Sequence, residues 1–318
     1  MAMLRFIIYD LAEASVEVKS VISFELSKDI SAACDGLRLT FYLPYLSGEI
    51  NRIEIFDGDK KIFNGYCDTQ RESISSDGME CFIYARSSAC ILVDNEALPF
   101  TYNCPSARTL FLKNAKDFGF EYALPEIYCD SSYQVSKGSS CFAAINNFVY
   151  GITGQNMMIN VNNELVLPDS NDNINLDNFD IISEKRIINR GNAVTAVDYK
   201  AYNENEYAHH IKSRFFDSKK INRTVKLNIS SLPEWQRDYT LVNTLKSAAS
   251  SYDTMELLLD GCKNIPLYCN IKYTSRLLGV IEDYYISSVC IISDKKGERT
   301  RLTLSKNIDL KEITYVAK

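Results

Sequence analysis

Apolar and polar residues alternate in short runs over the first hundred positions. In residues 21–27 and 37–43, apolar side chains occupy about every second place. A period of two puts successive side chains on opposite faces of a β-strand, so each strand has one buried face. The turn sequences DGD at 57–59 and SDG at 76–78 predict hairpins, and Gly65 predicts a bend or bulge. This pattern predicts a closed or nearly closed antiparallel barrel.

The pattern changes after residue 98. Apolar residues at helical spacing predict helices over 106–118 and 139–154, the first with Ser106 as N-cap and Gly119 as its stop. The sequence NN at 162–163 predicts a hairpin, because Asn tolerates left-handed turn conformations. These elements predict a small α+β module between two β-rich parts.

Strand-like alternation returns from about residue 181. Strands are expected at 192–202, 254–261, 269–274, 282–293 and 299–307. One long helix is predicted over 233–252, with Pro233 in its first turn, where proline is tolerated. Its apolar face is expected to contain Trp235, Tyr239, Val242 and Ala249. An internal duplication of the barrel is plausible, although no residue-level repeat is visible.

Three parts follow from this order of elements. The prediction is a first tube-like barrel at 1–98, an α+β module at 99–170, and a second tube-like barrel with one long helix at 171–318. The fold class is therefore mainly β with an α+β insertion. A length of 318 residues agrees with two or three domains.

Composition and charge restrict the function. The chain is 46% hydrophobic and 24% charged, as in ordinary soluble proteins. Its formal net charge of −6 argues against a duplex-DNA binder, which needs a concentrated basic face. The apolar run near the start is too short for a signal peptide and is broken by Asp10, and no window has the length of a membrane helix. We expect a protein made in the bacterial cytoplasm, without membrane binding.

The metal-binding residue types are poorly arranged for a metal site. The ten cysteines contain no C-x-x-C pair, and the only histidines are His209 and His210. Buried, reduced thiols are the favoured interpretation of the cysteines. The connector 169–180 partly matches a calcium loop through Asp169, Asn171 and Asn173, but the sixth and twelfth positions are not Gly and Glu. A solvated linker is the favoured interpretation, and no cofactor or metal ligand is assigned.

Catalytic residues are equally hard to assign. The two histidines stand without a G-x-S-x-G nucleophile elbow, and no phosphate-binding loop occurs. A carboxylate pair for glycoside cleavage is the open alternative, with Glu72, Asp77 and Glu80 as candidates around turns. We expect no enzyme, and no catalytic residue is assigned.

Two further features, the basic segment 212–226 and Trp235, can each be interpreted as structural or as functional. The segment 212–226 is basic, and it is either a solvated strand pair or a contact with nucleic acid or an acidic neighbour. Its charges are Lys212, Arg214, Lys219, Lys220, Arg223 and Lys226. A carbohydrate-binding β-module is a third function class, which the position of the single Trp235 in a predicted helix disfavours.

The order of elements resembles the baseplate hub proteins of contractile phage tails and tailocins, the late-control-D-like and PBSX-like prophage hub family. Members share a DG hairpin, an xGyxd strand and an xaRsxxxxLvD strand, here at 57–58, 65–68 and 85–94. The two helices and the sequence 277–305 continue the resemblance. One departure is Cys290, where many relatives have histidine.

The resemblance implies a structural role. Such hubs carry two tail-tube-like antiparallel β-barrels per chain and form a trimeric, pseudo-hexameric ring, a symmetry adaptor between the hexameric tail tube and a trimeric spike. The implied partners are other copies of the chain, the tail tube or tube-initiator protein, the spike and other baseplate proteins. The resemblance implies that DNA, if it is a partner at all, only passes through the lumen. The implied location is a phage or tailocin tail particle, and the alternative is a tail-associated cell-wall hydrolase or peptidase.

Overall fold

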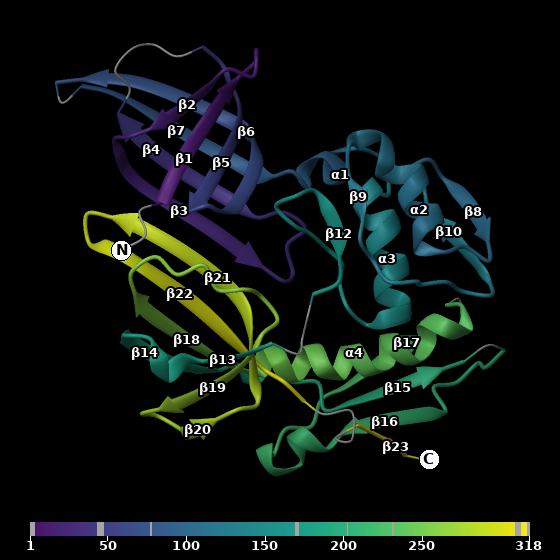
Figure 1. Cartoon of the computed structure of the whole chain (residues 1–318). Helices are drawn as coiled ribbons and strands as arrows, with labels where there is room; N and C mark the ends of the chain where they lie inside the picture. Colours follow the sequence, from purple (N-terminus) through teal and green to yellow (C-terminus); the bar gives the residue numbers. More distant parts are fainter. Residues whose placement is uncertain are drawn as a thin grey trace.

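The computed structural model describes residues 4–42, 48–76, 78–168, 172–201, 203–230, 232–308 and 313–316. Most of its elements are strands. Three shorter helices, α1 (Cys90–Asp94) to α3 (Cys141–Thr153), come from the middle of the chain, and one long helix, α4 (Glu234–Tyr252), follows later (Figure 1). The predicted mainly-β class with an α+β insertion is therefore confirmed.

The first seven strands form one antiparallel sheet. They are β1 (Leu4–Asp10), β2 (Ser15–Val18), β3 (Val21–Asp29), β4 (Gly36–Tyr42), β5 (Ile50–Asp57), β6 (Lys60–Ser75) and β7 (Gly78–Ser87). Their spatial order is β3-β4-β7-β6-β5-β1-β2. The sheet curls so that β1 meets β3, where the rings of Phe6 and Phe24 lie 5.0 Å apart. Alternate residues such as Leu26, Leu39 and Ile83 are fully buried, as the period of two predicts.

A second set of strands comes from the last third of the chain. It comprises β13 (Asn173–Asn175), β14 (Ile181–Ile188), β18 (Asp253–Asp260), β19 (Asn270–Ser275), β20 (Gly279–Ile281), β21 (Tyr284–Asp294) and β22 (Gly297–Lys306). Strand β21 pairs with β3, so the two sets form a continuous path from β14 to β2. One apolar core spans both sets. The prediction of two separate barrels differs from this: the described strands close no barrel, because β3 and β21 share a ladder.

The middle of the chain forms an α+β module with a core of its own, which begins with α1, before the expected boundary at residue 99. Its elements are α1 (Cys90–Asp94), β8 (Phe100–Asn103), α2 (Ala107–Asn114), β9 (Glu121–Tyr122), β10 (Ser132–Val135), α3 (Cys141–Thr153), β11 (Met158–Ile159) and β12 (Glu164–Val166). The side chain of Ser106 caps α2, and Gly119 with φ 82° ends the following turn, as predicted. Ser140 caps α3, and Asn163 has φ 64° in the β11–β12 hairpin. Leu110, Ile145 and Phe148 are in this module's own core.

The long helix α4 (Glu234–Tyr252) packs on a small separate sheet. Its strands are β15 (Ala196–Lys200), β16 (His209–Ser213), β17 (Thr224–Asn228) and β23 (Ile313–Val316), in the order β17-β15-β16-β23. The strand predicted at 192–202 therefore belongs to this sheet and not to a second barrel. The buried face of α4 contains Leu241 and Leu245, whereas Tyr239, predicted to be buried, is 38% exposed. The prediction failed because α4 contacts three bodies: the small sheet, the α+β module and strands β18 and β22 of the large sheet.

Gly65 serves a different purpose from the predicted bend. A Cβ atom there would lie 2.2 Å from the carbonyl oxygen of Arg86 and 2.6 Å from the ring of Phe63. The bulge itself falls at Asp68, where the ladder between β6 and β7 skips one residue. Glycine at 65 is thus required by close packing, and the bulge lies three residues later.

Replacing Gly65 by alanine should lower the free energy of unfolding by about 2 kcal/mol, because the backbone or the Phe63 ring must move. Gly48→Ala is the matched control, since a Cβ there meets no atom within 4 Å. Urea unfolding of both variants measures the difference. Equal stabilities would contradict the packing explanation.

Glu54 ties three strands together from a buried position. It is 6% exposed and accepts hydrogen bonds from Tyr9 Oη of β1 (2.8 Å) and from Lys61 Nζ of β6 (2.7 Å). Arg52 donates a further bond of 2.8 Å. Burial alone raises the pKa of Glu54, but the bonds from Lys61 and Tyr9 outweigh it and hold the pKa below the ordinary 4.5. The folded state therefore favours the ionised carboxylate.

The stability that Glu54 contributes should be complete above pH 4.5 and should be lost as the pH falls through its lowered folded-state pKa. Glu54→Gln should cost about 2 kcal/mol at pH 7 and should make the loss of stability in acid shallower. Chemical unfolding between pH 3 and 7 tests both points. A variant with the same acid profile as the natural chain would exclude this role.

Candidate assembly surface

The two longest hairpins of the protein have the same register. In β6–β7 and in β21–β22, three residue pairs precede a bulge and seven follow it. The bulged residues are Asp68 and Ser287, and the second strands begin at Gly78 and Gly297. Asp68 and Ser287 are 219 positions apart, and so are Gly78 and Gly297. The two hairpins therefore align residue by residue without a gap.

The bulges are held by equivalent side chains. Arg86 of β7 donates to Asp68, with Nη2 3.0 Å from Oδ1, and it also binds Asp94 at 2.6 Å. The position equivalent to Arg86 in β22 is Ser305, whose hydroxyl lies 2.8 Å from that of Ser287. Each bulged residue is therefore fixed by the same position of the neighbouring strand.

The repeat extends to the next two strands. β4 corresponds to β18 and β3 to β14, and the ladders skip Ile22 in β3 and Ile182 in β14 at equivalent places. Even an exposed ion pair recurs with its signs exchanged. Glu25 meets Arg38 at 3.0 Å in β3–β4, and Lys185 meets Glu256 at 3.4 Å in β14–β18. The four-strand unit β3-β4-β7-β6 thus recurs as β14-β18-β22-β21.

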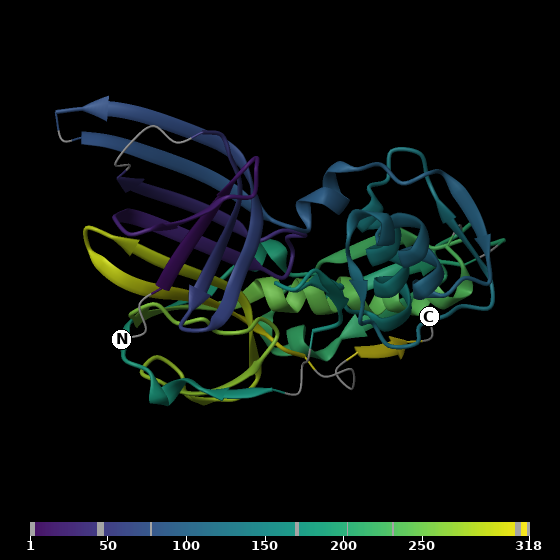
Figure 2. The same cartoon turned by 45° about the horizontal axis from the view of Figure 1, so that its top comes forward.

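At each bulge the strand leaves its first neighbour. Before the bulge, β6 pairs with β5 through Arg52 and Tyr66, and β21 pairs with β19 through Asn270 and Tyr285. After its bulge, β21 pairs with β3 over residues 288–293. The equivalent edge of β6, beyond residue 68, forms no ladder with any strand in the described ranges. Figure 2 shows the β6–β7 hairpin extending beyond the rest of the sheet.

Strand β14 provides the second open edge. Among the described strands it pairs only with β18, although its equivalent β3 has partners on both sides. Ile182 and Ile188 of β14 are 53% and 41% exposed. Open strand edges invite pairing with another chain. The chain therefore carries one repeated sheet unit with an open edge at each end.

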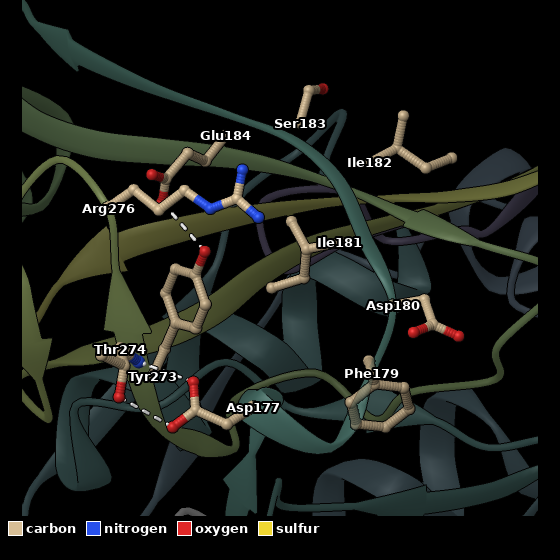
Figure 3. Close-up of a pocket in the computed structure, with 10 residues that line it drawn as sticks. All are labelled: Asp177, Phe179, Asp180, Ile181, Ile182, Ser183, Glu184, Tyr273, Thr274 and Arg276. Atoms are coloured by element: carbon tan, nitrogen blue, oxygen red, sulfur yellow. Dashed lines mark hydrogen bonds between the residues drawn. The ribbon is translucent and has the colours of Figure 1, made fainter.

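A groove of about 400 Å³ separates β14 from β19 (Figure 3). Side chains tie the two strands across it. Glu184 of β14 accepts from Tyr273 Oη at 2.9 Å and from Ser275 Oγ at 3.0 Å. Asp177, in the short helix before β14, accepts from the backbone N–H and the hydroxyl of Thr274, at 2.8 and 2.9 Å.

These carboxylates act as ties between strands. Burial, together with the bond to Glu184, raises the pKa of Tyr273 to about 12, so the phenol stays protonated and donates at neutral pH. Of the three carboxylates that line the groove, Glu184 and Asp177 each accept from two donors, which suits a structural joint. Within the ranges described, no group of three or more His, Cys, Asp or Glu side chains could hold a metal ion.

The carboxylates considered for glycoside cleavage lie near the tip of the β6–β7 hairpin. Glu72 pairs in register with Cys81, and Glu80 with Ser73. Asp77 lies outside the described residues. A projecting hairpin does not enclose a substrate, so the two described carboxylates do not form an active-site cleft.

The histidines lie side by side on β16 and face opposite sides of the small sheet. His209 Nε2 lies 2.7 Å from Glu204 and His210 Nδ1 lies 2.6 Å from Asp198. His209 also stacks on Tyr199 at 5.0 Å. Each ring therefore has a carboxylate partner, and no nucleophile accompanies either one in these contacts.

The basic segment spreads over one end of the small sheet. Lys212 pairs with Asp217, and Lys226 lies over the ring of Tyr207. Arg214, Lys220 and Arg223 are exposed. This agrees with a solvated surface.

The remaining residues singled out in the sequence have structural surroundings. Trp235 packs against Phe148 and Tyr133, at 5.9 and 6.4 Å between rings, and covers Gly151, so it is no exposed sugar platform. In the calcium-like connector, Asp169 and Asn171 lie outside the described residues, and Asn173 is in β13. The ten cysteines are free thiols. No helix in the described ranges has the length and apolar character needed to cross a membrane.

The sequence indicated an internal duplication but no residue-level repeat, because the signal of the repeat is in the backbone register. Equivalent core-facing positions differ in chemistry: Phe24 corresponds to Glu184, and Leu26 to Arg186. The two hairpins share only the number of residues between the bulge, the turn and the glycine that begins the second strand. That spacing becomes visible once the ladders are known.

The fold recurs in solved structures. A tail protein of Neisseria meningitidis MC58 matches with a TM-score of 0.76 and 14% identity, over 95% of this chain and 96% of that one. A 43 kDa tail protein of a Shewanella oneidensis prophage matches with a TM-score of 0.77 and 10% identity, over 96% and 98%. An Escherichia coli component of the type VI secretion system, itself similar to bacteriophage T4 tail proteins, matches with a TM-score of 0.56 and 8% identity, over 91% and 74%.

Sequence comparison adds nothing further, since no protein-family model and no curated protein matches the chain. The structural matches cover almost the whole chain. The chain thus has the fold of these phage tail proteins, and its resemblance to tail hub proteins is confirmed at the level of the fold.

Proposed function

We propose that the protein is a structural hub at the centre of a contractile tail baseplate. Three copies form a ring in which each chain contributes two tube-like units. The ring offers six similar units to the hexameric tail tube and threefold symmetry to a trimeric spike. Its partners are other copies of itself, the tube or tube-initiator protein, the spike and other baseplate proteins, and DNA passes only through the lumen.

The observation that carries this proposal is the four-strand register that occurs twice in one chain. A chain with two equivalent units can present sixfold-like symmetry with only three copies, because closed cyclic assemblies repeat each surface at equal angles. The proposed parts remain residues 1–98, 99–170 and 171–318. The matches to tail proteins over 95–96% of the chain support assembly into a phage or tailocin tail particle.

We expect the purified chain to form trimers, alone at high concentration or together with its spike. Their mass would be about 108 kDa, three times 36.1 kDa. Mass photometry and analytical ultracentrifugation measure this, and imaging of an assembled tail would place the ring between tube and spike. A chain that stays monomeric under all these conditions would refute the hub.

The alternative is a tail-associated cell-wall hydrolase or peptidase. We expect no release of wall fragments when the purified chain is incubated with bacterial cell walls, because Glu72 and Glu80 lie on a projecting hairpin. Glu72→Gln and Glu80→Gln, with the exposed Glu17→Gln as control, should therefore behave alike. Turnover that only the first two substitutions abolish would favour the enzyme.

A further inference from the structure

We propose that a cavity of about 690 Å³, where the large sheet, the α+β module and α4 meet, binds a short uncharged oligosaccharide. Its walls come from the end of α3, from α4, from the segment before β19, from the ends of β3 and β22 and from the start of β21. α4 contacts α3, β18 and β22, and Figure 1 shows α4 passing below α3 towards these strands. The proposal goes beyond the hub function and does not depend on a ring.

The wall of this cavity is polar but nearly uncharged. Among the described residues that line it, Ile30, Gly154 and Ile308 alone have no side chain able to form a hydrogen bond. Asp29 and Lys246 are the charged ones, and their charges are opposite. Serine, threonine, tyrosine, asparagine and glutamine make up the rest of the lining. The cavity therefore offers many neutral donors and acceptors and no net charge.

This wall selects the chemical class of the ligand. An apolar ligand would leave polar groups of the wall without partners, which is unfavourable for each buried one. A phosphate or carboxylate would need an excess of cationic side chains, which the described lining lacks. A sugar hydroxyl both donates and accepts, and so do the hydroxyls and amides of the wall. The volume lies within the range of about 300–1,000 Å³ of small-molecule sites, so an uncharged oligosaccharide is the class that fits.

Four lining residues have side chains that are not used within the protein. They are Gln155, Lys246, Ser247 and Asn307, whose side chains form no hydrogen bond or ion pair with another described residue. Gln155 follows α3, Lys246 and Ser247 belong to α4, and Asn307 follows β22. Unused polar groups from three elements thus border one space. A saccharide in the cavity can bind groups from all three elements at once.

Two tyrosine rings provide the apolar surface that a sugar ring needs. Tyr268 and Tyr285 line the cavity with their rings parallel to within 9° and 6.5 Å between centroids. The C–H groups of a sugar pack against the electron-rich face of an aromatic ring. Burial raises the pKa of both phenols, that of Tyr268 to about 12, so both hydroxyls stay protonated at neutral pH.

The backbone holds Tyr268 at the cavity wall. Its φ of 65° lies in the left-handed region, which residues other than glycine rarely adopt. Its N–H donates to the carbonyl of Ile286 at 2.9 Å, and the N–H of Ile286 donates to the carbonyl of Cys269 at 3.0 Å. Such conformations persist where the surroundings enforce them, and they cluster at binding sites. The ring is therefore in place before a ligand arrives, which lowers the entropy cost of binding.

Ligand-observed NMR and isothermal titration calorimetry on the full chain test the proposal. The probes are chitotriose and maltotriose, two neutral trisaccharides with and without acetamido groups. We expect at least one of them to bind with a Kd of about 1 mM or tighter. Glucose 6-phosphate should not displace it, because the described lining has no cationic excess. No binding of either probe at about 10 mM would overturn the proposal.

Filling the cavity tests where the probe binds. Ser247 is an exposed residue of α4 that lines the cavity, so Ser247→Trp should weaken binding at least about tenfold by occupying the space. Lys113→Trp is the matched control, since Lys113 is exposed on α2 and is not among the lining residues. This control should bind like the natural chain. Binding that survives Ser247→Trp would place the saccharide elsewhere and would refute the site.

Smaller substitutions keep the test decisive if Ser247→Trp lowers the melting temperature. Tyr268→Phe keeps the ring and should bind within about threefold of the natural chain, whereas Tyr268→Leu should lose about tenfold. Gln155→Ala combined with Lys246→Ala should also weaken binding about tenfold at an unchanged melting temperature, because neither side chain has a partner among the described residues. Full affinity in Tyr268→Leu and in the double variant would contradict the proposal. Mass photometry of the same samples reports the trimer separately, so a failure of saccharide binding leaves the hub standing.

Discussion

The arrangement depends on one skipped residue in each long hairpin. A bulged residue leaves the ladder of its own hairpin and twists the strand, so the strand pairs with one neighbour before the bulge and with another after it. Ser287 directs β21 from β19 to β3 and so joins the two units into one sheet. Asp68 is the equivalent bulge in β6, whose edge beyond it forms no ladder with a described strand, and Arg86 holds Asp68 by two hydrogen bonds, one of 3.0 Å.

The polar side chains of the protein mostly tie strands together. Glu54 joins β1, β5 and β6, and Glu184 joins β14 to β19. Buried or half-buried carboxylates of this kind are stable because each has several donors. The architecture therefore fits a protein whose strand edges and faces are its working parts.

The two copies of the repeated unit share their backbone register although their side chains differ. Ladder register is set by backbone hydrogen bonds and by bulge positions, which many side chains permit. Phe24 and its equivalent Glu184 face different surroundings, one a shared apolar core and the other the groove beside Tyr273. Identities of 8–14% to solved tail proteins beside almost complete structural coverage follow the same rule.

The sequence by itself determined the local elements, because each has a short-range cause. Period-two alternation gave the strands, Ser106 and Ser140 capped the helices, and Gly58 and Asn163 adopted the positive φ of their turns. It also indicated the absence of an evident catalytic constellation and, through the ordered elements, the resemblance to tail hubs.

Only the tertiary structure decided which strands are neighbours. The junction of β3 with β21 links residues more than 250 positions apart, and no local pattern encodes such a contact. The same holds for α4, which packs against the small sheet, the α+β module and strands β18 and β22, so that its buried face differs from a single helical stripe. The repeat, the bulge-directed switch of neighbours and the two open edges are properties of the assembled sheet, because they arise from backbone pairing between distant segments.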